Sequence, residues 1–304
     1  MARDPLASVD LIAGRRFAYA KAAAEEGDFI AAAELFEHAL AREPHWAAAW
    51  FALGEAREKL GELDAAAQAF RMSLGADPAD AQAAAARLAL MGRGNAPDAL
   101  PQAYVARLFD DYAPRFDKHL TDNLGHRAPA LIAEALTLVA RGRRFVSALD
   151  LGCGTGLMGV ALREPVDRLV GVDLSAAMIA KARERGLYDA LVVDDALAMV
   201  GREPPGSFDL IVAADALVYF GDLAPMFAAV GSPLTADGLF AFSVETCEGD
   251  GFQLEPTIRF THSRAYVEAT AREAGLRPLL IRSASTRREA GADAPGLVCV
   301  FEKT

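Results

Sequence analysis

Two different patterns of hydrophobic and polar positions divide this chain of 304 residues. In the second part, short apolar runs that end at glycine or acidic residues alternate with longer segments of helical composition, which predicts strands joined by helices. The predicted strands are Phe145–Leu151, Leu169–Asp173, Ala190–Val193, Phe208–Ala214, Leu239–Val244, Leu279–Ala284 and Leu297–Phe301. Helices are expected between the first six, which makes a doubly wound parallel sheet, whereas the last strand follows without a helix and should be antiparallel.

The first part of the chain repeats itself at an offset of 34 residues, as when Gly27 is aligned with Gly61. Other matching pairs are Ala32 with Ala66, Phe36 with Phe70, Leu40 with Leu74 and Pro44 with Pro78. This period and these residue types resemble the tetratricopeptide repeat family, although the first unit has Arg16 where the second has Trp50. The alanine-rich segment 79–91 should form a helix that caps the stack, and the glycine and proline cluster 92–97 predicts a boundary between an all-α repeat domain, 1–95, and a second domain, 96–304.

A glycine-rich turn follows the first predicted strand, which ends in Asp150, and the second strand ends in Asp173. This layout holds adenosine-type cofactors at the carboxyl ends of parallel strands. On its own, the run Gly154–Gly159 also fits the dinucleotide fingerprint. Asp150 argues for a cationic or amino-bearing ligand, because a carboxylate would repel a pyrophosphate at close range.

Residues 148–156 resemble motif I of the class I S-adenosylmethionine-dependent methyltransferases, and three later segments fit that family in order and spacing, at 170–175, 192–196 and 208–215. The resemblance runs from about Tyr104 to the C-terminus. It implies a Rossmann-like, seven-stranded doubly wound sheet behind the repeats, S-adenosylmethionine as the cofactor and S-adenosylhomocysteine as its product.

The resemblance also implies roles for individual residues. Asp173 would accept hydrogen bonds from both ribose hydroxyls. Gly152, Gly154 and Gly156 would let the backbone approach the cofactor, because a Cβ there would clash or forbid the required dihedral angles. Asp150 would face the methionine amino group through backbone and water.

The adenine side of the predicted site lies after the third strand. Asp195 would bind the adenine amino group and Ala196 would offer its backbone amide, while the alternative interpretation of Asp194 and Asp195 is an ordinary acidic loop. The remaining cofactor contacts that the resemblance implies are Leu174 and Met178 on the ring faces, with Asp194, Cys153 and Ala213 completing the set.

The aromatic segment from Tyr104 to Leu120 resembles the N-terminal lid of many small-molecule methyltransferases, and we place this lid at about 101–125. Tyr112 and Phe116 would close over the cofactor and exclude water. Alternatively, these rings only pack one helix against the domain, and the two interpretations are compatible.

Methyl transfer requires mainly alignment of the acceptor, and a general base is needed only where the acceptor must lose a proton. The candidates follow the fifth strand: Arg259 could bind an acceptor carboxylate, His262 could be a base, and Tyr266 lies one helical turn further on. In the alternative, Thr261 or Ser263 caps the helix and His262 is a surface residue. Tyr219, after the fourth strand, could line the acceptor pocket or pack in the core, and His119 and His126 are weaker candidates.

Net charge, hydropathy and cysteine content exclude several classes of binding partner for this chain. A formal net charge of -11 disfavours nucleic acid, and Arg141, Arg143 and Arg144 are expected to be a solvated helix end. No apolar stretch approaches the roughly 20 residues that span a bilayer, and no apolar signal core follows the N-terminus, which favours the cytoplasm. The 3 cysteines lack paired spacing, so neither disulfides nor a metal site is expected.

We therefore predict a methyltransferase that acts on a small-molecule, carrier-bound or protein acceptor, with the repeats as a docking or dimerising module. The enzymatic alternative is a NAD(P)-dependent oxidoreductase. The non-enzymatic alternative is a repeat-based adaptor whose second domain only binds S-adenosylmethionine.

Overall fold

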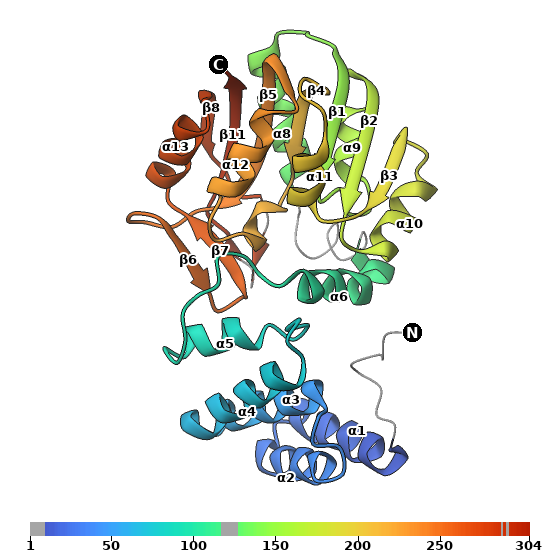
Figure 1. Cartoon of the computed structure of the whole chain (residues 1–304), viewed down its shortest axis with the longest axis vertical. Helices are drawn as coiled ribbons and strands as arrows, with labels where there is room; N and C mark the ends of the chain where they lie inside the picture. Colours follow the sequence, from blue (N-terminus) through green and yellow to red (C-terminus); the bar gives the residue numbers. More distant parts are fainter. Residues whose placement is uncertain (1–9, 117–126, 287, 290–291) are drawn as a thin grey trace. The chain divides into compact units, whose positions relative to one another are not determined.

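A computed structural model describes residues 10–116, 127–286, 288–289 and 292–304 (Figure 1). The chain folds into two compact units, Met1–Tyr104 and Val105–Thr304. Each unit is described by itself.

The first unit consists of antiparallel helix pairs, as the repeat pattern predicts. Its helices are α1 (Leu11–Glu25), α2 (Phe29–Leu40), α3 (Ala47–Lys59), α4 (Leu63–Ala76) and α5 (Ala84–Leu90). Ala32 and Ala66 have no exposed surface, which allows close approach of the paired helices. A Cβ on Gly54 would lie 2.6 Å from the Phe70 ring, so this glycine makes room for the aromatic side chain that fills the space between α3 and α4.

Helix α5 is shorter than the predicted helix over 79–91. Asp80 and Ala83 adopt left-handed backbone conformations, with φ of 51° and 57°, and these interrupt the helix before Ala84. The Asp80 carboxylate then accepts hydrogen bonds from the backbone N–H groups of Ala84 and Ala85, at 2.6 and 3.0 Å. A side chain thus satisfies the first donors of the helix, a local effect that alanine content does not reveal.

The second unit is built on a sheet whose main strands follow the order β3-β2-β1-β4-β5-β11-β8. These strands are β1 (Phe145–Leu151), β2 (Val166–Asp173), β3 (Ala190–Val193), β4 (Phe208–Ala213), β5 (Leu234–Glu245), β8 (Leu276–Ser283) and β11 (Gly296–Lys303). Strands β1 to β5 pair in parallel, and β11 is antiparallel to both β5 and β8. The predicted seven-stranded doubly wound sheet with an antiparallel last strand is confirmed.

Two further strands lie where the sequence analysis expected only a connection. Strands β6 (Phe252–Glu255) and β7 (Arg259–His262) form an antiparallel hairpin, and β7 meets the end of β5 through Glu245 and Thr261. A separate two-stranded sheet consists of β9 (Arg288–Glu289) and β10 (Ala292–Asp293). The β6–β7 hairpin follows the carboxyl end of β5 and places Arg259 and His262 there.

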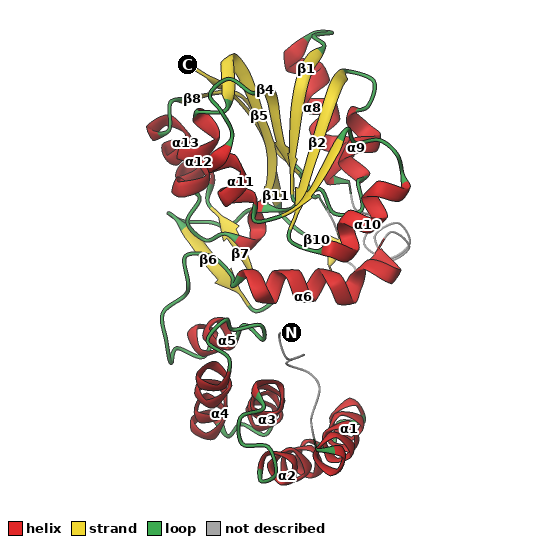
Figure 2. Cartoon of the chain, turned by 45° about the vertical axis from the view of Figure 1, so that its right-hand side comes forward, coloured by secondary structure: helices red, strands yellow, loops and turns green. Residues whose placement is uncertain are grey.

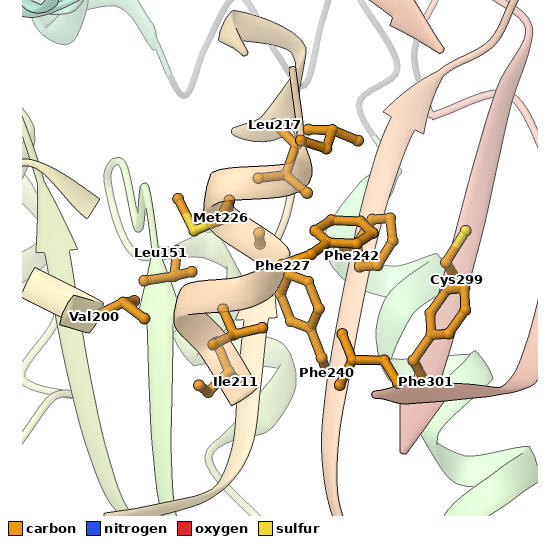
Figure 3. Packing of buried hydrophobic residues seen from close by; sticks show 14 of the residues in the cluster. Leu151, Val200, Ile211, Leu217, Met226, Phe227, Phe240, Phe242, Cys299 and Phe301 are labelled. Atoms are coloured by element: carbon orange, nitrogen blue, oxygen red, sulfur yellow. The ribbon is translucent and has the colours of Figure 1, made fainter. Parts of the chain in front are cut away.

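Helices cover both faces of the main sheet (Figure 2). The helical elements of this unit are α6 (Gln102–Tyr112), η1 (Ala113–Arg115), α8 (Ala128–Ala140), α9 (Leu157–Leu162), α10 (Ala176–Glu184), α11 (Ala196–Arg202), η3 (Leu217–Tyr219), α12 (Ala224–Gly231) and α13 (Arg264–Glu273). Under α11, α12 and α13 the core is aromatic, with Phe227, Phe240 and Phe242 in mutual ring contact (Figure 3). Under α8 and α9 it is mainly aliphatic, around Ile132 and Leu210.

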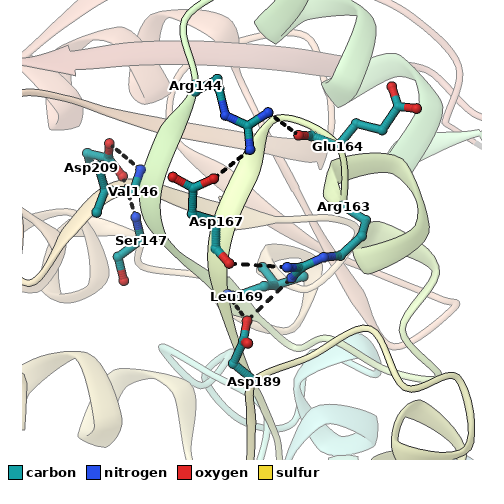
Figure 4. A network of polar contacts seen from close by, with 9 residues as sticks. All are labelled: Arg144, Val146, Ser147, Arg163, Glu164, Asp167, Leu169, Asp189 and Asp209. Atoms are coloured by element: carbon teal, nitrogen blue, oxygen red, sulfur yellow. Dashed lines mark hydrogen bonds and ion pairs between the residues drawn. The ribbon is translucent and has the colours of Figure 1, made fainter.

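Polar contacts join the amino ends of β1, β2 and β4 (Figure 4). The Asp209 carboxylate accepts hydrogen bonds from the backbone N–H groups of Val146 and Ser147, both at 2.9 Å. Arg144 pairs with Asp167 at 2.5 Å, so it joins β1 to β2 and is not only a solvated helix end. These contacts lie at the opposite edge of the sheet from the predicted cofactor residues.

Candidate functional site

The predicted cofactor residues meet at the carboxyl edge of the sheet. Asp150 in β1 pairs in register with Gly171 in β2 and with Val212 in β4, and Asp173 pairs with Val193 at the end of β3. The parallel register therefore brings motif I, the acidic tip of β2 and the loop after β3 to one edge.

The glycine loop between β1 and α9 has the backbone that glycine permits. Gly152, Gly154 and Gly156 have φ of 66°, 53° and 89°, all in the left-handed region. A Cβ on Gly152 would lie 2.7 Å from the Ala216 Cβ, whereas one on Gly154 would meet only the Phe116 ring, at 3.9 Å. Contacts within the protein therefore account for the missing side chain at Gly152, whereas at Gly154 they leave room for one.

Asp173 is fixed by the same loop. Its two carboxylate oxygens accept hydrogen bonds from the backbone N–H groups of Gly154, at 2.9 Å, and Ser175, at 2.8 Å. Each oxygen can accept a further bond, so the carboxylate retains capacity for two ribose hydroxyls. Burial raises the pKa of Asp173, and the two backbone bonds partly offset that effect.

Asp150 has no exposed surface, and its Oδ2 accepts a hydrogen bond of 2.6 Å from the Tyr188 hydroxyl. Its Oδ1 is buried and has no hydrogen-bond partner among the described residues. Burial raises the pKa of Asp150 to about 7, while the bond from Tyr188 lowers it. An orphaned buried oxygen of this kind fits a cationic group such as the amino group of S-adenosylmethionine.

Tyr188 also explains the third glycine of the dinucleotide-like run. A Cβ on Gly159 would lie 2.6 Å from the Tyr188 ring, so the glycine accommodates a side chain of the protein. The third glycine of the nicotinamide-like run is therefore explained by the packing of Tyr188, and no bound pyrophosphate is needed to explain it.

The loop after β3 has structural bonds of its own. Asp195 caps α11 by accepting a hydrogen bond of 2.8 Å from the Ala198 N–H, and Asp194 is paired with Arg202. Their predicted adenine contacts, like that of Ala196, stay predictions. Among the other predicted cofactor residues, Leu174 is half-buried, whereas Met178, Cys153 and Ala213 are buried.

The described part of the predicted lid carries a cluster of aromatic rings. Phe116 makes edge contacts with Tyr112, at 5.1 Å between ring centroids, and with Phe109, at 6.1 Å. Phe109 in turn contacts Tyr219 at 5.5 Å, which joins the lid helix α6 to the end of β4. Residues 117–126, which include the rest of the lid segment with His119 and His126, lie outside the described residues.

Asp110 links the lid helix α6 to the N-terminus of α10 by hydrogen bonds, a role that the sequence does not reveal. Its Oδ1 accepts hydrogen bonds from the Ser175 hydroxyl, at 2.5 Å, and from the Ala177 N–H, at 3.2 Å. Ser175 lies two residues after Asp173, so the lid is tied to the cofactor edge. Asp110 and Ser175 are far apart in the sequence, and no local pattern marks the pair.

Two of the predicted acceptor-side residues lie together. The Arg259 guanidinium lies over the Tyr219 ring, at 5.6 Å, and forms an ion pair of 3.0 Å with Glu245. Tyr219 is buried, so both of its predicted functions, pocket lining and packing, agree with its position between Phe109 and Arg259. Burial opposes the charge of Arg259, but Tyr219, Glu245 and Asp215 outweigh it, and the pKa of the guanidinium is raised.

His262 differs from both sequence interpretations, because it has no exposed surface and is neither an accessible base nor a surface residue. Its Nε2 lies 2.9 Å from the Phe220 carbonyl oxygen and 3.1 Å from that of Gly221, so Nε2 carries the proton. Burial lowers the pKa of His262 to about 4. The neutral imidazole ring therefore holds the loop after η3 in place through these two carbonyl groups.

Tyr266 acts on the same loop. Its hydroxyl donates to Asp222 Oδ1 and accepts from the Leu223 N–H, both at 2.8 Å, and its ring stacks on His262 at 6.0 Å. Ser263 caps α13 by accepting from the Tyr266 N–H, as the alternative interpretation held. Both rings therefore position the segment that follows Tyr219, and their predicted catalytic roles find no geometric support.

Within the described residues, no three His, Cys, Asp or Glu side chains gather closely enough to hold a metal ion. None of the described helices combines the length and the apolar character that crossing a membrane requires.

Comparison with known proteins gives two family matches on separate parts of the chain. Residues 148–238 match the family model described as a methyltransferase domain, and residues 17–81 match a tetratricopeptide repeat model. Methyltransferase-like protein 27 of Homo sapiens is 36% identical over 121 residues, 38% of this chain and 47% of that protein. Malonyl-[acyl-carrier protein] O-methyltransferase of Salmonella typhimurium is 29% identical over 165 residues, 54% of this chain and 62% of the relative.

A solved structure supports the fold. The 1,6-didemethyltoxoflavin-N1-methyltransferase of Burkholderia thailandensis, with bound 1,6-didemethyltoxoflavin and S-adenosylhomocysteine, has a TM-score of 0.52 and 22% identity, over 69% of this chain and 93% of that one. The alignments cover 47% and 62% of the two sequence relatives, so the matches concern the domain and not those whole proteins. With its strand order and its glycine loop, the chain therefore has a methyltransferase domain with the fold of the S-adenosylmethionine-dependent methyltransferases, preceded by tetratricopeptide repeats.

Proposed function

We propose that this chain transfers the methyl group of S-adenosylmethionine to a carboxylate of a small or carrier-bound acceptor. The observation that carries the proposal is the position of Arg259, a half-buried arginine whose guanidinium lies over the Tyr219 ring, beside a loop whose histidine is neutral and inaccessible. When bound, the cofactor supplies an electrophilic methyl group on a sulfonium.

A carboxylate acceptor fits the burial of His262, the histidine that lies on the acceptor side among the described residues. Carboxylates are ionised at neutral pH and can act as nucleophiles without losing a proton, whereas a hydroxyl would require a general base. His262 cannot serve that purpose in the described state, because it lies buried with its Nε2 bonded to two carbonyl oxygens. The remaining task for the protein is orientation, which supplies much of the rate enhancement.

Arg259 has donors available for that orientation. A guanidinium carries five N–H donors, and the ion pair with Glu245 uses Nη1. Glu245 is itself buried, so the pair holds the planar guanidinium in one place and leaves the rest of it for an incoming carboxylate. The malonyl group in the name of the Salmonella relative carries such a carboxylate.

The repeat unit would bring the acceptor or its carrier protein to the enzyme, or join two copies of the chain. A cavity of about 390 Å³ lies along its helices, lined by apolar residues such as Leu40 and Trp50 together with Arg57 and Gln68. We place the activity in the cytoplasm, where the free thiols of Cys153, Cys247 and Cys299 would stay reduced.

The experiment that tests this function uses a labelled methyl donor with dicarboxylic acids and acyl-carrier proteins bearing them. Methyl esters release methanol in mild alkali, whereas N-methyl and C-methyl products do not, so an alkali-labile product supports the proposal and an alkali-stable one overturns it. Arg259→Gln should lower kcat/KM by about a hundredfold, the loss of a charged hydrogen-bond pair of roughly 3 kcal/mol. Arg264→Gln, at an exposed arginine of α13, is the matched control.

The cofactor assignment has its own test. Asp173→Ala removes the carboxylate at the tip of β2, and binding of S-adenosylhomocysteine by calorimetry should then be lost while the circular dichroism spectrum stays unchanged. Unaltered binding in this variant would refute the placement of the cofactor.

A further inference from the structure

Tyr188, between α10 and β3, fills a space that three glycines leave open. Cβ atoms built on Gly159 and Gly171 would lie 2.6 and 2.9 Å from the nearest atoms of its ring, and one on Gly156 would lie 3.1 Å from it. These glycines come from α9, β2 and the glycine loop. Gly159 and Gly171 do not have positive φ, so packing explains why no side chain fits there: the Tyr188 ring limits the space at Gly159, and the ring together with Leu191 Cδ2, also at 2.9 Å, limits it at Gly171.

The hydroxyl at the end of this ring has two defined hydrogen bonds. It donates to Asp150 Oδ2 at 2.6 Å and accepts from the Gly159 N–H at 3.0 Å. The accepted bond fixes the hydroxyl proton toward Asp150, because an N–H can only donate. The carboxylate is thereby held in one rotation, with its second oxygen, Oδ1, buried and without a hydrogen-bond partner among the described residues.

We infer that Tyr188 is a positioning residue for the cofactor, which keeps Asp150 oriented so that Oδ1 receives the ammonium group of the methionine moiety. The inference rests on the proposed function, because it requires that S-adenosylmethionine binds at this edge. A buried cation is stabilised by an opposite charge whose direction is fixed before binding. Tyr188 fixes the direction of the carboxylate through Oδ2, the oxygen that the cofactor does not contact in this arrangement.

The electrostatics of Asp150 agree with this role. Among the described residues, the titratable groups that face it are Tyr188, Cys153 and Asp173. Burial and the charge of Asp173 raise the pKa of Asp150, and the hydrogen bond from Tyr188 opposes both. Removal of the hydroxyl would raise the pKa of Asp150 further and so favour the neutral carboxylic acid, which attracts an ammonium group far less.

The test compares two ligands by calorimetry on the full chain. S-adenosylhomocysteine carries the amino acid moiety, whereas 5′-methylthioadenosine keeps the adenosine and the sulfur but lacks the amino group. Tyr188→Phe retains the ring and removes only the hydroxyl. We expect it to weaken S-adenosylhomocysteine about tenfold at pH 7, from the loss of one hydrogen bond to a charged group, and to leave 5′-methylthioadenosine unchanged.

A pH series adds a readout that a purely structural role would not change. In the wild type, affinity for S-adenosylhomocysteine should fall as the pH drops below about 7, where Asp150 takes up a proton. In Tyr188→Phe the fall should begin at a higher pH, and in Asp150→Asn it should disappear. Tyr19→Phe, at an exposed tyrosine of α1, is the matched control and should behave as the wild type.

The outcomes of these measurements separate this inference from the proposed function. If Tyr188→Phe weakens both ligands equally, or shifts no pH profile, Tyr188 only fills space and the inference is overturned. If the wild type binds neither ligand, the cofactor assignment itself has failed. Selective weakening of S-adenosylhomocysteine with a displaced pH profile supports the inference.

Discussion

Protonation of His262 should weaken the fold in a pH range that its burial defines. The pKa of His262 is lowered from 6.5 to about 4 in the folded protein, because burial penalises the imidazolium. The unfolded chain therefore binds the proton more tightly, and stability that is fully present above pH 6.5 is lost as the pH falls toward 4. A difference of about 2.5 units at 1.36 kcal/mol each corresponds to about 3 kcal/mol, an order-of-magnitude figure.

The assay is urea unfolding between pH 7.5 and 4.5 of the wild type and His262→Asn, whose amide can still donate to the Phe220 carbonyl. Between pH 6 and 5 the wild type should lose about 1 kcal/mol more than the variant. The raised pKa of Asp150 acts in the opposite direction, with stability lost as the pH rises toward 7, and the comparison cancels it because both proteins contain Asp150.

The chain provides an internal control for this experiment. Its 2 tryptophans, Trp46 and Trp50, both lie in the repeat unit, so their fluorescence reports on that unit alone. Hydrogen exchange of peptides from β7 and the loop after η3 reports on the second unit. Only the exchange signal should depend on His262, and parallel pH dependence of wild type and variant in that signal would refute the reasoning.

Two further changes test contacts described above. Gly54→Ala puts a Cβ 2.6 Å from the Phe70 ring and should destabilise the repeat unit by about 1–3 kcal/mol in unfolding monitored by tryptophan fluorescence. Gly75→Ala, at a helical position with open space around it, should stabilise the unit slightly. Equal effects of the two variants would contradict the packing argument. Asp110→Ala removes the acceptor for Ser175 and should weaken S-adenosylhomocysteine binding about fivefold, for a loss of about 1 kcal/mol, and speed exchange in α6. The neighbouring Asp111→Ala, which removes an exposed ion pair of 3.7 Å with Arg107 in the same helix, should leave this binding unchanged.

Periodicity in the sequence predicts the sheet well, because buried parallel strands read as apolar runs that end at glycine or acid. Strands Phe145–Leu151 and Ala190–Val193 match their predicted bounds, and the repeat helices follow from a self-similarity that independent packing would not produce. The β6–β7 hairpin was missed because its strands have only four residues each, pair mainly with each other, and do not read as apolar runs, since buried β7 contains Thr261 and His262.

The site was harder to predict than the fold. His262 seemed available in the sequence, but a hairpin that no periodicity reveals buries it. Tyr188 was missed because its partners come from three separate segments. One signal did exist: Gly159 and Gly171 stand inside a helix and a strand, where glycine is unfavourable unless a large neighbour requires it.

Tyr188 and the three glycines around its ring, Gly156, Gly159 and Gly171, are four positions whose side-chain volumes depend on one another. A related sequence with a small residue at position 188 would leave an empty space unless larger side chains replaced Gly159 and Gly171, and alanine at either glycine would have no room beside a tyrosine. A change of side-chain volume at any one of these sites is therefore acceptable only together with a compensating change elsewhere in the group. Descendants of an ancestral gene would inherit or exchange the four residues as a set.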